Sequence, residues 1–146
     1  MNQDSSPFDL DRFIEAQEAD YETALRELKN GQKVSHWIWY IFPQLAELGY
    51  SYRAKYYGLE GLEDARAYMD HPVLGPRYLK CVEALLEHQD RPIAQIMGGE
   101  IDAKKLRSSL TLMLAAGGGG NIERALDAFY GKSKCRETSR SLDQDF

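Results

Sequence analysis

At 146 residues the chain has the length of one ordinary domain, long enough to bury a core without disulfide or metal cross-links. Apolar residues make up 43% and charged residues 28%, a balance typical of globular rather than disordered proteins. The net charge of -5 argues against nucleic acid and membranes as partners, because neither surface attracts an acidic protein. We predict one domain over residues 1–146, with an ordered core from about residue 7 to residue 130.

The sequence contains no recognisable targeting, cofactor or metal motif. The N-terminal residues have no basic start and no apolar run, and no stretch reaches the ~18 apolar residues of a membrane span, so we expect a cytoplasmic protein. Cys81 and Cys135 stand far apart, which predicts no metal site and no disulfide. Cys81 shares a helical face with apolar residues, and we expect a buried side chain there. We predict no cofactor, because glycine-rich nucleotide fingerprints are absent.

The first predicted helix begins near Asp9 and ends at Asn30-Gly31. Its apolar face recurs at steps of three, four and seven and consists of Leu10, Phe13, Ile14, Gln17, Tyr21, Ala24, Leu25 and Leu28. Asp9, or Ser6 followed by Pro7, has the chemistry of an N-cap. Gln17 is the amide on that face. A buried amide needs hydrogen-bond partners, so Gln17 either braces a neighbouring backbone or points into a pocket, and the first is favoured.

An aromatic segment follows from residue 36 to residue 42. It is apolar all round, so periodicity does not separate helix from strand, and a short helix is our interpretation. Pro43 disfavours α conformation at Phe42 and places an end there. Residues 43–48 predict a further helical turn, which Gly49 stops. Residues 49–61 are rich in tyrosine and predict a loop with some extended structure.

The later helices are marked by apolar periodicity and by glycine or proline at their ends: residues 62–70, 76–88, 92–97, 102–116 and 121–129. Asp102 and Asn121 have the chemistry of N-caps for the last two. The four glycines from 117 to 120 predict a flexible link. Residues 131–146 predict one last short helix or a disordered tail. The fold class is therefore all-α, a single domain of about six to eight short helices.

His36 is the first candidate functional residue. It lies beside Ser35 and the large apolar groups that follow, and Gln44 closes the segment. An imidazole in an aromatic wall is a setting for tuned proton transfer or ligand hydrogen bonding. Trp37 and Trp39 give flat surfaces on which a planar group stacks. The competing interpretation is that both tryptophans are core and that His36 bonds to a backbone carbonyl.

A second candidate is the helix face that carries Lys105, Ser108 and Ser109, with Leu112 beside them, opposite the predicted core face. A lysine with clustered hydroxyls suits a phosphate or carboxylate ligand. The same spacing is typical of a solvated helix face, and spacing alone favours that second interpretation.

Several segments carry a resemblance: Pro7–Phe13 with Ala16-Gln17, Gly31–Trp37 through Pro43–Leu45, Gly49 with Ser51, Ala65–Tyr68 with His71–Arg77, and Asp102–Ser109 with Thr111-Leu112. In these the chain resembles the bacterial family of unknown function numbered 1810, also called the 1873-like all-helical superfamily. The resemblance spans about residues 7–130 and weakens after Phe129. It implies a mainly helical single domain with no established activity. The signature residues it implies are Gln17, His36, Trp37, Pro43, Gln44, Ser51, Lys105, Ser108 and Ser109.

The leading hypothesis is a pocket for a small planar anionic ligand, of nucleotide or ADP-ribose type, between residues 36–44 and 105–109. In it Trp37 or Trp39 stacks, His36 and Gln44 form hydrogen bonds, and Lys105 with Ser108 or Ser109 holds the anion. Gln17 and Ser51 complete the candidate set. If the chain is an enzyme, His36 is the acid–base group. The alternative is a non-catalytic domain that binds a partner protein or a second copy through the aromatic segment. The sequence leaves the oligomeric state open.

Overall fold

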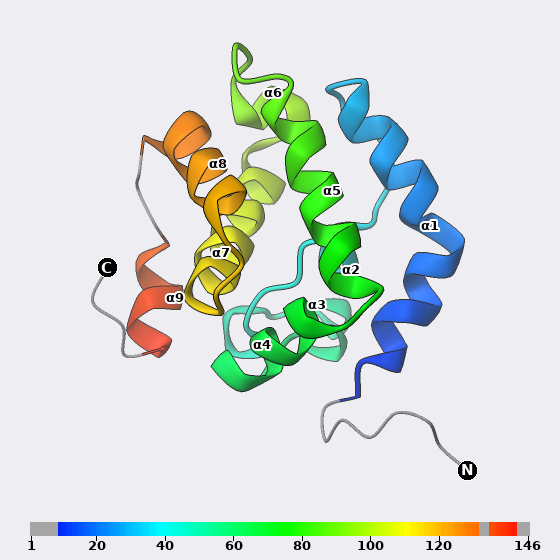
Figure 1. Ribbon diagram of the computed structural model, residues 1–146, viewed down its shortest axis with the longest axis vertical. Helices are drawn as coiled ribbons and strands as arrows, with labels where there is room; N and C mark the ends of the chain where they lie inside the picture. Colours follow the sequence, from blue (N-terminus) through cyan, green and yellow to red (C-terminus); the bar gives the residue numbers. More distant parts are fainter. Residues whose placement is uncertain (1–8, 132–134, 143–146) are drawn as a thin grey trace.

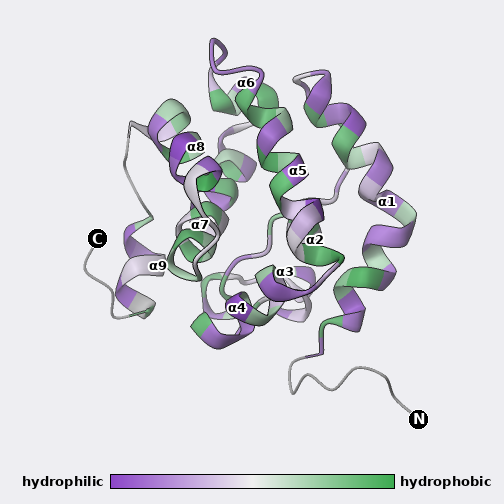
Figure 2. Ribbon diagram, viewed as in Figure 1, coloured by the Kyte–Doolittle hydropathy of each residue, from purple (hydrophilic) through white to green (hydrophobic). Residues whose placement is uncertain are grey.

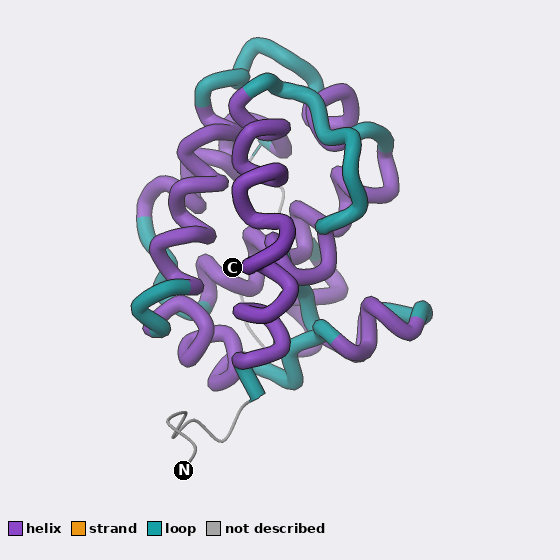
Figure 3. The backbone as a smooth tube through the Cα atoms, turned by 90° about the vertical axis from the view of Figure 1, so that its right-hand side faces the viewer, coloured by secondary structure: helices purple, strands orange, loops and turns teal. Residues whose placement is uncertain are grey.

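The computed structural model describes residues 9–131 and 135–142, and helices are the regular elements of these residues (Figures 1 and 3). In chain order they are α1 (Asp11–Lys29), α2 (Ile38–Ile41), the 3-10 helix η1 (Ala46–Leu48), α3 (Tyr52–Tyr56), α4 (Leu62–Asp70), α5 (Leu74–Leu86), α6 (Ile93–Met97), α7 (Glu100–Ala115), α8 (Gly120–Tyr130) and α9 (Arg136–Ser141). The predicted all-α class is confirmed. The described residues form nine α-helices, one more than the upper end of the predicted range.

Two helices organise the packing. The α5 helix contacts α1, α4 and α8, and in Figure 1 it lies between α1 on one side and α7 with α8 on the other. The α7 helix contacts α2, α4, α6, α8 and α9, so it is covered on most sides. Apolar positions of the helices turn towards one another (Figure 2), and edge-to-face ring pairs such as Phe13–Tyr68, at 5.2 Å, fill the core.

The predicted helix ends are largely confirmed. After α1, the Asn30 amide bonds to the Arg26 carbonyl and Gly31 takes a positive φ of 75°, which glycine adopts without a steric penalty. Phe42, before Pro43, leaves the helical region with φ −127° and ψ 73°, and this ends α2. Gly98 ends α6 in the left-handed conformation.

The predicted N-caps are wrong. The α1 helix is preceded by Leu10 rather than Asp9, α7 by Gly99 rather than Asp102, and α8 by Gly119 rather than Asn121, none with a side-chain cap. Asp102 instead lies in the first turn of α7, where its carboxylate pairs with Lys33 at 2.8 Å. Local preference would use this side chain as a cap, but in the fold it forms a tertiary ion pair instead. Ser6 and Pro7 lie outside the described residues.

Residues 49–61 are more helical than predicted, because they contain α3. Ser51 caps this helix, since its Oγ accepts the Ala54 amide at 3.1 Å. The extended structure expected in this segment is limited to one isolated parallel bridge, between Leu45 and Leu59. Apolar periodicity did not reveal α3, because its apolar residues Tyr52 and Tyr56 are exposed rather than buried. Their rings stack on each other with centres 5.8 Å apart.

The glycine link between α7 and α8 has defined hydrogen bonds rather than the predicted looseness. The Gly118 amide bonds to the Met113 carbonyl at 2.9 Å, and a Cβ at Gly118 would stand 2.8 Å from that same carbonyl oxygen. Beyond α8, the helical alternative for the end of the chain is confirmed over Arg136–Ser141. The remaining residues of the predicted tail, 132–134 and 143–146, lie outside the described part. No helix within the described residues has the length and apolarity to cross a membrane.

Candidate functional site

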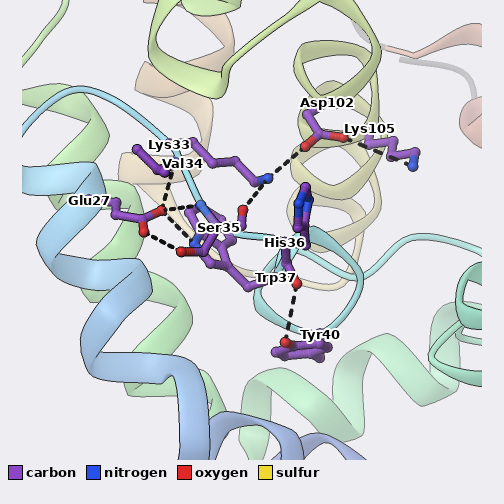
Figure 4. Close-up of polar contacts among 9 residues, drawn as sticks. All are labelled: Glu27, Lys33, Val34, Ser35, His36, Trp37, Tyr40, Asp102 and Lys105. Atoms are coloured by element: carbon purple, nitrogen blue, oxygen red, sulfur yellow. Dashed lines mark hydrogen bonds and ion pairs between the residues drawn. The ribbon is translucent and has the colours of Figure 1, made fainter.

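Glu27 on α1 organises the segment that carries His36. Its carboxylate, 8% exposed, accepts four hydrogen bonds: from the Val34 amide at 2.9 Å, the Ser35 amide at 3.0 Å, the Ser35 hydroxyl at 2.6 Å and the Trp37 indole at 2.9 Å (Figure 4). Burial of the carboxylate raises its pKa, but these hydrogen bonds outweigh it and lower the pKa of Glu27 to about 2. Glu27 is therefore a charged brace inside the fold.

Lys33 ties the same segment to α7. Its ammonium group donates to the Ser35 carbonyl at 2.7 Å, pairs with Asp102 at 2.8 Å and lies 4.9 Å from the centre of the Trp37 ring (Figure 4). Asp102 also lies 4.0 Å from Lys105, one turn further along α7. The two halves of the predicted site, residues 36–44 and the Lys105 face, therefore lie together in space.

The structure does not place His36 in the expected aromatic wall. The His36 side chain is exposed. Its backbone carbonyl accepts a hydrogen bond from the Tyr40 hydroxyl at 3.3 Å, and its imidazole has no hydrogen-bond partner among the described residues. Trp37 is completely buried and Ile38 nearly so, and their inward turn leaves the preceding imidazole outside. The wall exists, but His36 is not part of it.

The two tryptophans differ in their surroundings. Trp37 belongs to the core and uses its indole N–H on Glu27. Trp39 is half-buried and lies near two cations, with Arg53 5.1 Å and Lys105 5.4 Å from its ring centre. Its indole Nε1 is buried with no hydrogen-bond partner in the described part of the chain.

Three other predicted residues bond to the protein itself. The Gln17 amide, 2% exposed, donates to the Tyr40 carbonyl at 2.7 Å and to the Tyr68 hydroxyl at 3.0 Å, so the bracing interpretation is confirmed. Ser109 is completely buried and bonds to Tyr78 at 2.8 Å. Ser51 caps α3. The solvated-face interpretation of residues 108–112 is wrong, because Ser108, Ser109 and Leu112 are buried under the helices that surround α7.

A cleft of about 560 Å³ lies against α7. Its first wall is the chain segment after α2, with Gln44, Glu47, Leu48 and Tyr50. Its second wall is α7, with Ile101, Lys104, Lys105, Arg107 and Ser108. Its third side is the start of α9, with Cys135 and Glu137. We call this the α7 cleft. It unites Gln44, Lys105 and Ser108 of the predicted site.

Two residues that line the α7 cleft have side-chain atoms whose hydrogen-bonding capacity is unused. Gln44 Oε1 and Arg107 Nε are both buried, and neither has a hydrogen-bond partner in the described part of the chain. Most buried polar atoms in proteins are paired, so each unpaired one calls for an explanation, such as a bound water, an ion or another group. Gln44 Oε1 accepts a hydrogen bond and Arg107 Nε donates one. The cleft therefore offers a buried acceptor on one wall and a buried cationic donor on the other.

Hydrogen bonds link two sides of the α7 cleft, α7 and the start of α9. The Ser108 hydroxyl lies 3.1 Å from Cys135 Sγ, and the Cys135 amide donates to Thr111 Oγ1 at 2.9 Å. The second cysteine, Cys81, is in the core as predicted, and burial raises the pKa of its thiol to about 12. The described residues contain no group of three or more metal-ligating side chains that could hold a metal ion.

Comparison with known proteins decides the family. A family model described as a protein of unknown function (DUF1810) matches residues 7–142. The chain belongs to this family. The crystal structure of the conserved hypothetical protein Rv1873 from Mycobacterium tuberculosis is 40% identical to it, with a TM-score of 0.91, over 96% of this chain and all of that one. No curated protein matches the chain.

The family match extends through α9, past Phe129, where the resemblance was expected to weaken. It includes two cleft residues that sequence reasoning missed, Arg107 and Glu137. Arg107 stands inside the segment Asp102–Ser109 that carries the family resemblance, so its signal was available. Glu137 had none, because its place depends on how α9 packs against α7. Glu27 was also missed, although it is buried on α1 three residues after Ala24 and directly before Leu28.

Proposed function

We propose that the α7 cleft binds a small planar anionic molecule of the nucleotide or ADP-ribose type. The observation that carries the proposal is the pair of buried, unpartnered atoms Gln44 Oε1 and Arg107 Nε, which belong to residues on two different walls of the cleft. The Arg107 guanidinium suits a phosphate or carboxylate oxygen, and Lys104 and Lys105 add positive charge to the same wall. Gln44 Oε1 suits an N–H on the planar part of the ligand.

The stacking surface in this proposal is Tyr50 rather than a tryptophan. Tyr50 borders the cleft and is 94% exposed, so its ring face is free to receive a planar group. Trp37 is completely buried. The alternative, a docking surface made by the aromatic segment, has less support, since Trp37, Ile38 and Phe42 are each at most 2% exposed.

Thermal unfolding with AMP, ADP-ribose, adenosine and inorganic phosphate tests the proposal. A ligand at about 100 times its Kd raises the free energy of unfolding by about 2.7 kcal/mol, which moves the Tm by several degrees. We expect AMP or ADP-ribose to stabilise the chain more than adenosine or phosphate alone. Arg107→Gln should weaken binding at least ~10-fold, because a charge-assisted hydrogen bond is lost.

Arg124→Gln is the matched control, because Arg124 is an exposed arginine on α8 that does not border the cleft. It should bind as wild type does. The proposal is wrong if none of the four compounds raises the Tm, or if the two arginine variants bind alike.

His36→Ala tests whether His36 contacts the ligand. His36 does not border the cleft, so we expect nucleotide affinity to change less than ~2-fold and stability by less than ~0.5 kcal/mol, as for other exposed positions. Isothermal titration calorimetry with the compound that binds best measures the first quantity. A loss of more than 10-fold would place His36 in contact with the ligand and restore the first form of the hypothesis.

A further inference from the structure

Glu137, in the first turn of α9, borders the same cleft as Arg107. The Cys135 thiol donates to Glu137 Oε1 at 3.4 Å, and the same sulfur lies 3.1 Å from the Ser108 hydroxyl. Because the Cys135 amide is also anchored to Thr111, the start of α9 is held against α7. These contacts hold the Glu137 carboxylate at the border of the cleft.

This carboxylate is charged and acts on the cations of the cleft. The hydrogen bonds from its own backbone amide and from Cys135 lower the pKa of Glu137, and the nearby Arg107 and Arg140 lower it further. Arg107 and Glu137 do not form an ion pair within the described part of the chain. The two side chains therefore do not neutralise each other by direct contact, although both residues line the cleft in which a ligand anion would lie.

We propose that the Glu137 carboxylate competes with the ligand's anionic group for the cations of the α7 cleft. It thereby weakens anion binding and selects against highly charged ligands. The inference rests on the proposed function, which supplies the ligand. Its physical basis is Coulomb's law, because a ligand anion that approaches Arg107 also approaches the Glu137 carboxylate. The repulsion scales with the ligand's charge, so a phosphomonoester is penalised about twice as much, in free energy, as a phosphodiester.

Glu137→Gln is the direct test. Glutamine keeps an oxygen acceptor for the Cys135 thiol, so the contact of α9 with α7 is preserved while the charge is removed. Titration calorimetry measures the affinities of wild type and variant for AMP, a phosphomonoester, and for 3′,5′-cyclic AMP, a phosphodiester. We expect the variant to bind AMP about 10-fold and cyclic AMP about 3-fold more tightly, and both gains to shrink in 0.5 M salt.

Glu123→Gln is the matched control, since it removes an equal charge from an exposed position on α8 away from the cleft. It should leave both affinities unchanged. The inference alone is overturned if wild type binds AMP through Arg107 but Glu137→Gln gains nothing, or if Glu123→Gln gains as much. If neither wild type nor Glu137→Gln binds AMP, cyclic AMP or ADP-ribose, the proposed function fails with it. Binding by Glu137→Gln and not by wild type would support both.

Discussion

Replacing Glu27 with alanine is expected to destabilise the protein by about 3–5 kcal/mol, which is a large part of the stability of an ordinary domain. The substitution leaves two backbone amides, the Ser35 hydroxyl and the Trp37 indole without their shared acceptor. A buried donor that loses its partner keeps the full cost of having left water. Denaturant unfolding followed by circular dichroism measures the loss.

Two further variants separate this explanation from a general sensitivity of α1. Glu22→Ala removes an exposed glutamate from the same helix and should change the free energy of unfolding by less than ~0.5 kcal/mol. Glu27→Gln keeps the shape but removes the charge, and we expect an intermediate loss of about 2–3 kcal/mol. If Glu27→Ala were no more harmful than Glu22→Ala, the brace would have no energetic role.

The same carboxylate gives the protein an acid sensitivity of known sign. The pKa of Glu27 is about 2 in the folded chain against 4.5 for a free glutamate, so folding favours its ionised form. The resulting stability, about 3 kcal/mol, is present above pH 4.5 and is lost as the pH falls towards 2. Unfolding free energies measured between pH 7 and pH 2.5 should therefore fall more steeply for wild type than for Glu27→Gln.

The sequence predicted helices well where a local signal ends them. Asn30-Gly31 ended α1 and Pro43 ended α2, because a positive φ and the clash before proline act on the backbone itself. The start of α7 was misplaced for the opposite reason. Asp102 has a capping side chain, but its partner is Lys33, 69 positions away in the chain, and no local rule contains that pair.

The candidate site divides in the same way. The sequence identified the α7 segment that carries Lys105 and Ser108, but it could not tell Ser108, at the cleft, from Ser109, in the core. The two residues are adjacent, and they differ because α9 covers one side of α7 while Tyr78 of α5 bonds to the other. Helical periodicity gives the faces of a helix, and only the tertiary structure says what packs on each.

Trp37→Ala is expected to destabilise the protein by about 3–5 kcal/mol, because it removes a completely buried indole and leaves a cavity beside Phe42. Trp39→Ala is the comparison, and we expect about 1–2 kcal/mol there, since Trp39 is half-buried and its indole N–H has no hydrogen-bond partner among the described residues. Guanidinium unfolding of both variants measures the difference. Equal losses would contradict a core role that is specific to Trp37.

The effects of Trp37 and Glu27 should not add. The Trp37 indole donates one of the four hydrogen bonds that Glu27 accepts, and the other three hold residues 34 and 35, three and two positions before the tryptophan. Once Glu27 is alanine, the indole N–H already lacks its partner, so Trp37→Phe should cost less in that background than in wild type. A double-mutant cycle should give a coupling of at least ~1 kcal/mol. Strict additivity would mean that Glu27 stabilises the loop alone and that the tryptophan is held by packing.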